Sequence, residues 1–317
     1  MIGTPLMLFC SPERLIMSTP GRETMYNKAQ LEEMAASVGY WWHSIDLGRG
    51  VVTDGFKTRE TLKDELELLR LPDLRDKTVL DIGAWDGFFS FEAERRGARR
   101  VVALDHYIWS IDLLKANPLR RHGQQYLREG KVAPPDQDTP NGQPDKLPGK
   151  RGYDTAHKAL DSKVETVVGD FMTMELEPLG TFDVVFFLGV LYHMENPLAS
   201  LRRVASLSNG VVIIETHAIV VPGYEHLELC EFYSSNQLGG DASNWWGPNL
   251  KALEGMCRAA GFARVKVLIG AGCVDAVHPR VSLSRKSRNA ARHILREFSL
   301  VPPLTPGHFR AVVHAWK

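Results

Sequence analysis

Short apolar runs rich in β-branched residues alternate with segments of helical periodicity from Lys77 to the end of the chain. The runs predict buried strands, and apolar residues at three-to-four spacing predict helices. The alternation predicts an α/β fold in which helices cover a Rossmann-like, mostly parallel sheet of seven strands. The strands are expected at Thr78–Ile82, Arg100–Leu104, Lys163–Val168, Phe182–Phe187, Gly210–Glu215, Ala263–Leu268 and Phe309–Ala315. The helices are expected at Asp86–Arg96, Pro197–Ser206 and Pro248–Ala260.

Two long segments interrupt this alternation. Residues 109–162 form an insertion after the second strand, and their middle, residues 134–150, is rich in Pro, Gly and Asp, which predicts a loop. Residues 274–308 separate the last two strands. They contain a basic run, Arg285–Arg296, whose interspersed apolar residues suit an amphipathic surface helix.

The segment before the first strand has a different character. A helix is expected at Lys28–Ser37, and the aromatic stretch Tyr40–Leu47 leads into a glycine-containing turn. We therefore expect an irregular tail (1–24), a helical and aromatic N-terminal cover (25–70), and a core (71–317) that carries the insertions at 109–162 and 274–308.

The charge balance and the cysteine spacing bear on whether the protein binds nucleic acid, a membrane or a metal. Lys and Arg together number 38, as do Asp and Glu, so the formal net charge is zero and no whole-protein field attracts a polyanion. The basic run at Arg285–Arg296 can touch RNA phosphates, but general nucleic-acid binding is disfavoured. The sequence predicts a soluble cytoplasmic protein without a metal site or a membrane span, because no stretch reaches about 18 apolar residues and the cysteines lack the paired spacing of a zinc site. The cysteines are Cys10, Cys230, Cys257 and Cys273.

A nucleotide-binding loop is indicated where the first strand passes through a glycine-containing turn into a helix, from Val79 to Phe89. Glycine lets the backbone approach a ligand, and the helix N-terminus presents free N–H groups. Asp81 at the strand end suits a cationic amino group, whereas it would repel a dinucleotide pyrophosphate. Asp105 closes the second strand 24 positions later, near the offset of about 20 residues at which an acid accepts ribose hydroxyls. The sign of the charge favours S-adenosylmethionine (SAM).

The next two strands also end in suitable groups. Gly169, Asp170 and Phe171 follow the third strand, where an acid and an aromatic ring can bracket an adenine. Leu188 ends the fourth strand beside the expected sulfonium, and the segment from Gly189 to His193 follows it. A single acid at a strand end is often only a cap. Four consecutive strand ends with matching chemistry make that explanation weaker, because ligands bind at this edge of open α/β sheets.

The segment from Asp81 to His193, together with the last strand, resembles a class I SAM-dependent methyltransferase. The resemblance implies an antiparallel last strand. It also implies that Asp81, Gly83 and Gly87 surround the methionine part of SAM, with Ala84 and Trp85 in the same loop. Asp105 would bind the ribose, and Asp170 with Phe171, after Gly169, would flank the adenine. Trp85 replaces the middle glycine of the family's Asp-x-Gly-x-Gly-x-Gly pattern, and we expect this bulky residue to avoid a positive φ.

A closer resemblance is to tRNA wobble-uridine (carboxy)methyltransferases. It rests on the segments Gly189–His193 and Trp245–Asn249 and on the Glu215-Thr216 strand end. These enzymes follow the Tyr-His pair with arginine, where Met194 stands here, and the lysine that they carry near the position of Trp42 has no counterpart. The resemblance implies that a carboxylated form of SAM would need these cationic partners, and this chain lacks them. Ordinary SAM is therefore favoured.

Methyl transfer from a sulfonium requires alignment of the acceptor with the methyl carbon, and a hydroxyl acceptor also calls for a base. The candidate bases are His43, His193 and His217, although each can be a hydrogen-bonded structural histidine. Aromatic side chains expected to wall an acceptor pocket, unless they are ordinary core residues, are Trp42, Tyr192, Tyr233, Trp245 and Trp246. Acids at Glu225, Glu228 and Glu231 follow the fifth strand, where a solvated charged face is the simpler interpretation.

We therefore expect a SAM-dependent methyltransferase that acts on a small molecule, at a hydroxyl of a metabolite or natural product. The first alternative is a tRNA wobble-uridine modifier, and the second is a non-catalytic SAM-binding protein. A nicotinamide oxidoreductase is disfavoured, because Gly83 to Gly87 lacks the Gly-x-Gly-x-x-Gly spacing. The pattern leaves the acceptor atom and the oligomeric state open.

Overall fold

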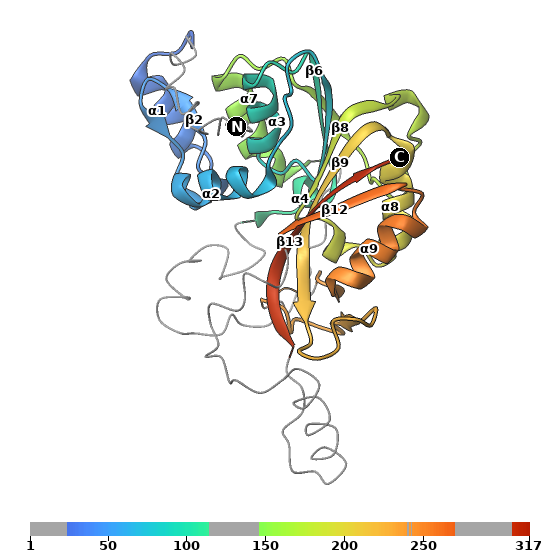
Figure 1. Cartoon of the computed structure of the whole chain (residues 1–317). Coiled ribbons are helices and arrows are strands. Elements are labelled where there is room, and N and C mark those ends of the chain that lie inside the picture. Colours follow the sequence, from blue (N-terminus) through green and yellow to red (C-terminus); the bar gives the residue numbers. More distant parts are fainter. Residues whose placement is uncertain (1–23, 114–145, 240, 242, 270–305) are drawn as a thin grey trace, which may run out of the picture.

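The core of the protein is a seven-stranded sheet with the strand order β12-β13-β9-β8-β5-β6-β7 (Figure 1). The computed structural model describes residues 24–113, 146–239, 241, 243–269 and 306–317. Five neighbouring strands pair in parallel, and β13 runs antiparallel to both of its neighbours, so that β12 has the same direction as the five. The predicted Rossmann-like sheet with an antiparallel last strand is confirmed. The strands are β5 (Thr78–Ile82), β6 (Arg100–Asp105), β7 (Glu165–Val168), β8 (Phe182–Leu188), β9 (Ser208–Val220), β12 (Arg264–Ile269) and β13 (Gly307–Trp316).

Strand limits differ from the sequence prediction mainly in β9, which continues to Val220 instead of ending at Glu215. The extra length is held by β13, which pairs with β9 from Val211↔Trp316 to Val220↔Gly307. The parallel neighbour β8 ends at Leu188, opposite Glu215. The last five residues of β9 therefore extend past the carboxyl edge of the parallel strands.

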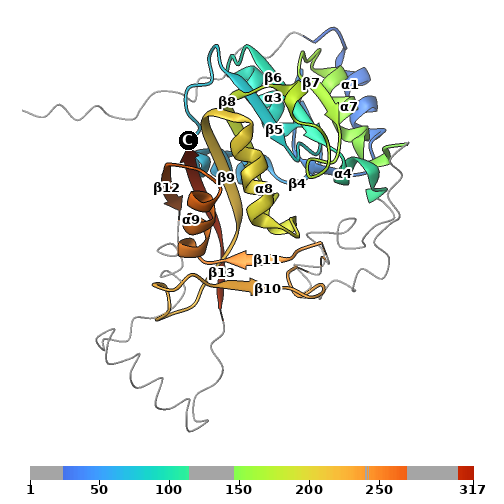
Figure 2. The same ribbon diagram turned by 90° about the vertical axis from the view of Figure 1, so that its right-hand side faces the viewer.

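Helices cover both faces of the sheet because each central strand is apolar on both sides. In β8, Val184 and Phe186 belong to one buried cluster, whereas Val185 and Phe187 belong to the other. The first cluster is covered by α3 (Phe88–Arg95) and α7 (Arg151–Ala159), and the second by α8 (Pro197–Ser206) and α9 (Leu250–Ala259). Figures 1 and 2 show these helix pairs on opposite sides of the sheet.

Local chemistry sets where these helices begin. The helix α8 spans the predicted residues, with Pro197 in its first turn and the Asn196 side chain accepting from the Ala199 N–H at 3.0 Å. The helix α9 starts at Leu250 rather than Pro248, because Asn249 is its N-cap. The helix α3 starts at Phe88 rather than Asp86, because Gly87 has a φ of 87° and is its N-cap.

The segment before the core forms a small cover made of two helices and four short strands. The helix α1 (Lys28–Ala36) matches the predicted Lys28–Ser37 except for its last residue. Strands of two or three residues follow it, and β1 pairs in parallel with β4 while β2 pairs with β3. These elements are β1 (Trp41–His43), β2 (Asp46–Gly48), β3 (Val51–Val52), β4 (Gly55–Lys57) and α2 (Arg59–Leu69).

The first predicted insertion contains part of the core. After α4 (Tyr107–Ser110), the 3-10 turn η1 (Pro148–Lys150) forms the end of the expected loop, and α7 is the crossover helix between β6 and β7. Residues 1–23, 114–145 and 270–305, which include the predicted helix at Arg285–Arg296, lie outside the described residues. The domain limits drawn from the sequence stay predictions. Within the described ranges, no helix is long and apolar enough to cross a membrane.

Candidate active site

The turn after β5 is built around two glycines that no other residue replaces without strain. Gly83 has a φ of 80°, and a Cβ there would lie 2.6 Å from Val190 Cγ2. Gly87 has a φ of 87°, and a Cβ there would lie 2.5 Å from the ring of Phe91 and 2.8 Å from that of Tyr153. The turn therefore follows its neighbours closely and leads into α3. This edge lies between β5 and β8, the switch point at which open α/β sheets bind ligands.

Asp81 and Asp105 are both buried at this switch point. Asp81 accepts a hydrogen bond from Ser90 Oγ at 2.6 Å, and burial raises the pKa of Asp81 to about 7. Asp105 accepts from the backbone N–H groups of Trp85 at 3.0 Å and Ile108 at 3.3 Å, and burial raises its pKa to about 6. Two buried carboxyl groups that raise each other's cost of ionisation fit a cationic ligand group. The resemblance implies that the amino group of SAM is this cation, and its contact with Asp81 stays a prediction.

Trp85 adopts a φ of 51°, so the expectation that it avoids the left-handed region is wrong. Three contacts offset the steric cost of about 1–2 kcal/mol. Its N–H donates to Asp105, its carbonyl accepts from Trp109 Nε1 at 2.6 Å, and its ring stacks on Trp42 with a centroid separation of 4.6 Å. Tertiary contacts therefore fix this backbone conformation.

The turn after the third strand, Gly169 to Phe171, lies beside the end of β6. The Gly169 N–H donates to the Asp105 carbonyl at 3.2 Å, which ties this turn to the end of β6. Asp170 accepts from the Met172 N–H at 2.8 Å and is exposed. The Phe171 ring is only 7% exposed and packs against Phe187. The flanking of adenine by Asp170 and Phe171 stays a prediction, as does the place of the half-buried Leu188 beside the sulfonium.

His43 lies on the cover and contacts the turn after β5 through Asp86, a residue that sequence reasoning did not single out. The Asp86 carboxylate is 2% exposed and accepts from His43 Nδ1 and from the backbone N–H groups of Trp42 at 2.9 Å and His43 at 2.8 Å. The His43 ring also packs against Phe88 and Phe89. These contacts dock the cover onto the loop and place Trp42 over Trp85.

His193 and His217 lie nearer to the ends of β8 and β9. His193 lies in the 3-10 turn η3 (Leu191–His193), and its Nδ1 lies 3.1 Å from the Ser243 carbonyl and 3.0 Å from Ser243 Oγ. His217 lies on the part of β9 that extends past β8. The Tyr192 ring contacts both histidine rings, at centroid distances of 4.2 Å from His193 and 6.3 Å from His217.

A hydrogen-bonded chain that runs from the buried His217 to the half-buried Glu231 supports His217. Its Nε2 lies 2.9 Å from Tyr233 Oη, and Tyr233 Oη donates to Glu231 Oε2 at 3.1 Å. Burial, together with His308 and Arg310, lowers the pKa of His217 to about 4. Burial and Glu231 raise the pKa of Tyr233, so the phenol keeps its proton. His217 is therefore a neutral imidazole at pH 7.

Arg310 is a cation at the same edge that the sequence analysis missed. It forms a two-pronged ion pair with Glu215, and its guanidinium lies 4.8 Å from the centroid of the Tyr192 ring. A charged residue directly before the apolar residues Ala311–Val313 was the available signal, but its partner lies 95 residues away. Gly189 faces this group, since a Cβ there would lie 3.7 Å from Arg310 Nη2.

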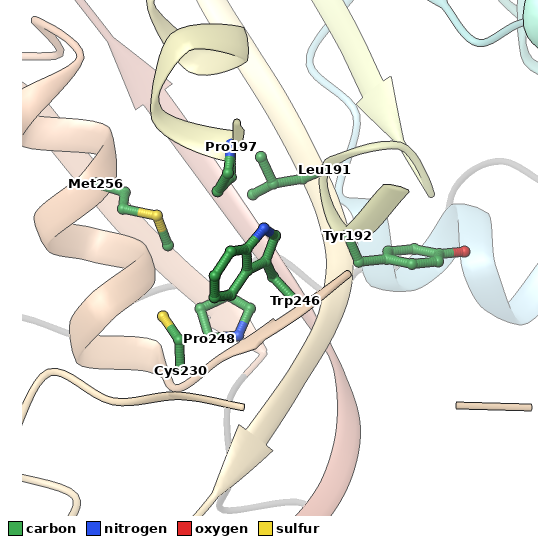
Figure 3. A pocket seen from close by; sticks show the side chains of 7 residues that line it. All are labelled: Leu191, Tyr192, Pro197, Cys230, Trp246, Pro248 and Met256. Carbon is green, nitrogen blue, oxygen red and sulfur yellow. The ribbon is translucent and has the colours of Figure 1, made fainter. Parts of the chain in front are cut away.

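Trp245 and Trp246 belong to a neighbouring region. The strand β11 (Trp246–Pro248) pairs with β10 (Cys230–Phe232), and the side chains of Trp246, Pro248 and Cys230 line an apolar cavity of about 130 Å³ (Figure 3). Tyr192 also lines that cavity, and its ring extends away from the other lining side chains in Figure 3. The Trp245 N–H donates to the Tyr192 carbonyl at 2.8 Å. The structure thus joins Tyr192 and Tyr233 to His217, and it places Trp246 in the apolar cavity.

One strand separates these two environments. A Cβ on Gly247 would lie 2.6 Å from Tyr233 Oη and 3.3 Å from His217 Cδ2, so glycine lets β11 pack directly against the His217 chain. No three His, Cys, Asp or Glu side chains in the described part of the chain are grouped closely enough to hold a metal ion.

Several known proteins are similar in sequence to a large part of this chain. The tRNA U34 carboxymethyltransferase of Shewanella loihica is 28% identical over 204 residues, which are 64% of this chain and 47% of that protein. The enzyme of the same name from Shewanella piezotolerans is 23% identical over 294 residues, 91% and 71% of the two chains. The chain spans about half the length of several of these curated relatives.

Solved structures and a family profile complete the comparison. The N-terminal domain of EvdMO1, crystallised in the presence of SAH and D-fucose, is 16% identical, with a TM-score of 0.52 over 92% of this chain and 97% of that domain, which shows the common fold. The profile of the methyltransferase domain matches residues 56–267. The expected class I fold, the resemblance to the tRNA U34 enzymes and the expectation of SAM as cofactor are thereby confirmed. The chain belongs to the methyltransferase-domain family.

Proposed function

We propose that this protein transfers the methyl group of SAM to a hydroxyl group of a small molecule, with His217 as the base. The observation that carries the proposal is the His217–Tyr233–Glu231 chain beside Tyr192, past the carboxyl edge of the parallel strands. A neutral imidazole accepts the proton that a hydroxyl loses when its oxygen attacks carbon.

The hydrogen bonds fix which imidazole nitrogen is basic. Tyr233 has one hydroxyl proton and donates it to Glu231, so the His217 Nε2–H must donate to the Tyr233 oxygen. The lone pair is then on His217 Nδ1. When this nitrogen takes a proton, the Glu231 carboxylate, reached through Tyr233, offsets part of the cost that burial, His308 and Arg310 impose on the positive charge.

The cofactor end of the site performs the complementary task. SAM supplies an electrophilic methyl carbon when bound: a new O–C bond forms, the C–S bond breaks, and S-adenosylhomocysteine (SAH) leaves. Asp81 holds the amino group and Asp105 holds the ribose, so the chain fixes the cofactor from two adjacent strand ends. The acceptor proton passes to His217 Nδ1, which balances the reaction.

Charge at the acceptor end favours a small molecule over RNA. Glu225, Glu228 and Glu231 lie between β9 and α9, and the Arg310 cation is already paired with Glu215. A phosphate backbone gains little from such a surface. A cytoplasmic location is part of this proposal. The second candidate, modification of a tRNA wobble uridine, is favoured by the names of the curated relatives.

Transfer of a labelled methyl group separates these functions. The protein is incubated with methyl-labelled SAM and with either the ultrafiltered small-molecule fraction of a cell extract or total tRNA. The proposal predicts label in the small-molecule fraction, in a product that survives mild alkali as an ether does. Asp81→Ala should abolish this label, which controls for carry-over of SAM.

Label that appears in tRNA and is released by ribonuclease would overturn the small-molecule proposal and support the tRNA function. SAH binding in calorimetry with no transfer to either fraction would instead support a non-catalytic SAM-binding protein. A small-molecule product whose label is lost in mild alkali would overturn the hydroxyl assignment, because methyl esters hydrolyse under these conditions.

A further inference from the structure

The loop residue Trp85 carries backbone strain at the point where the cofactor ribose is expected. Its φ of 51° lies in the left-handed region, which an L side chain occupies only when its surroundings hold it there. In this conformation the Trp85 N–H donates to Asp105 Oδ2 at 3.0 Å. One of the hydrogen bonds that orient the Asp105 carboxyl group, beside the one from the Ile108 N–H, therefore depends on Trp85 staying in a strained conformation.

The ring of Trp85 is held from the other side by the cover. Trp42 is the middle ring of a three-ring stack: its centroid lies 4.6 Å from Trp85, with an angle of 8° between the planes, and 4.8 Å from Phe56, with an angle of 2°. Lys57 Nζ lies 5.9 Å from the centroid of the Trp42 ring. Trp42, which lies on β1, is thus in contact with the turn after β5 through Trp85 and with the paired strand β4.

The backbone of Trp42 is fixed separately from its ring. The Asp86 carboxylate accepts from the Trp42 N–H, and β4 approaches β1 so closely that a Cβ on Gly55 would lie 2.2 Å from the carbonyl carbon of His43. The Trp42 ring therefore has little freedom to follow a displaced loop. It presents a fixed surface against which Trp85 stacks.

We propose that Trp42 and Trp85 are cofactor-positioning residues: the Trp42 ring holds Trp85 in its left-handed conformation, and Trp85 in turn holds the Asp105 carboxyl group in place for the ribose of SAM. The cover thus belongs to the cofactor site through an aromatic contact. The inference rests on the assignment of Asp105 to the ribose and is independent of the acceptor.

Two substitutions at one position separate the ring from the backbone. Trp85→Gly removes the ring but retains the N–H and adopts the left-handed conformation without strain, so SAH affinity should stay within about threefold of the wild type. Trp85→Ala removes the ring and keeps the steric cost, so the affinity should fall about tenfold. Equal affinities of the two variants in titration calorimetry would contradict the proposal.

A double-mutant cycle then tests the role of Trp42. Trp42→Ala should weaken SAH binding about tenfold in the wild type, because the stack that offsets the strain is lost. In the Trp85→Gly background the same substitution should have less than about a twofold effect, since no strain is left to offset. Trp42→Phe, which keeps a stacked ring, should retain most of the affinity. A Trp42→Ala effect of equal size in both backgrounds would overturn the inference.

Controls distinguish this inference from its premise. Trp246→Ala removes an indole at the acceptor side and should leave SAH affinity unchanged. Circular dichroism and thermal unfolding of each ligand-free variant identify variants that have lost their fold. If Trp85→Ala or Trp42→Ala is among them, SAH affinity is compared in Trp85→Gly and Trp42→Phe instead. If Asp105→Ala leaves SAH affinity unchanged, the ribose assignment is wrong. If Asp105→Ala weakens SAH binding while the effects of the Trp42 and Trp85 substitutions are additive, the ribose assignment stands and only the positioning role is wrong.

Discussion

The ionised form of the Asp81 carboxyl group favours cofactor binding but destabilises the ligand-free fold. Its carboxyl group is 3% exposed, and burial raises its pKa from 3.8 to about 7. Folding without a ligand therefore favours the protonated form, while a cofactor ammonium group favours the ionised form. Asp81→Asn removes the charge and keeps an oxygen that can accept from Ser90.

The size of both effects follows from the pKa shift. A group with a raised pKa contributes stability below its unfolded value, and that stability is lost as the pH rises through about 7. A shift of about three units corresponds to about 4 kcal/mol of unfolding free energy at high pH. At pH 8, ligand-free Asp81→Asn should be more stable than the wild type by up to this amount, yet bind SAH about 10- to 100-fold more weakly.

Thermal unfolding and titration calorimetry between pH 6 and pH 8 measure the two effects. Wild-type SAH affinity should fall about tenfold from pH 8 to pH 6, as the ionised fraction of Asp81 falls from roughly nine-tenths to roughly one-tenth. Asp81→Asn should lose most of this dependence, and only the part that Asp105 contributes, with its pKa of about 6, should remain. Asp183→Asn is the matched control, because a backbone hydrogen bond from Thr78 lowers the Asp183 pKa. This variant should lose stability and keep SAH affinity.

A destabilised Asp81→Asn protein that binds SAH like the wild type would refute this reasoning. The carboxyl group would then be a structural hydrogen-bond acceptor, and the cation of the cofactor would lie elsewhere.

Three further predictions concern the acceptor end and the cover. His217→Gln should lower kcat about 100- to 10,000-fold with unchanged SAH affinity. In the wild type, protonation of His217 should lower the rate only when the pH nears 4. Equal kcat values in the two proteins would exclude His217 as the base. Gly247→Ala places a Cβ 2.6 Å from Tyr233 Oη and should cost about 1–3 kcal/mol in urea unfolding and lower kcat. In contrast, Gly255→Ala, inside a helix with its nearest neighbour at 3.4 Å, should be neutral or stabilising by up to about 1 kcal/mol. His43→Ala leaves the buried Asp86 carboxylate without its His43 partner and should lower the free energy of unfolding by about 2–4 kcal/mol. A lower kcat at unchanged stability would instead indicate a catalytic histidine.

The fold was predictable where buried strands leave a continuous apolar run. Thr78–Ile82 forms β5 at its predicted limits, and the central strand β8 ends one residue after the prediction, at Leu188. The two- and three-residue strands of the cover are too short to show a period of two, so sequence patterns give no sign of β2, β3 or β4. Their positions depend on contacts such as the close approach of Gly55 to His43.

The site divides in a similar way. Asp81 and Asp105 were predictable because a parallel sheet brings successive strand ends to one edge. The pairs His43 with Asp86 and Arg310 with Glu215 join residues 43 and 95 positions apart, which no local pattern specifies. The φ of Trp85 was mispredicted for a related reason, because steric preference within the residue is overcome by stacking on a distant ring.

A crystal structure of the protein with SAH tests the central claim most directly. The account predicts the amino group of the ligand within hydrogen-bonding distance of the Asp81 carboxylate, the ribose hydroxyl groups on Asp105, and the sulfur facing the side of Tyr192 and His217. A ligand bound away from Asp81 and Asp105, or one whose sulfur faces away from Tyr192 and His217, would contradict it.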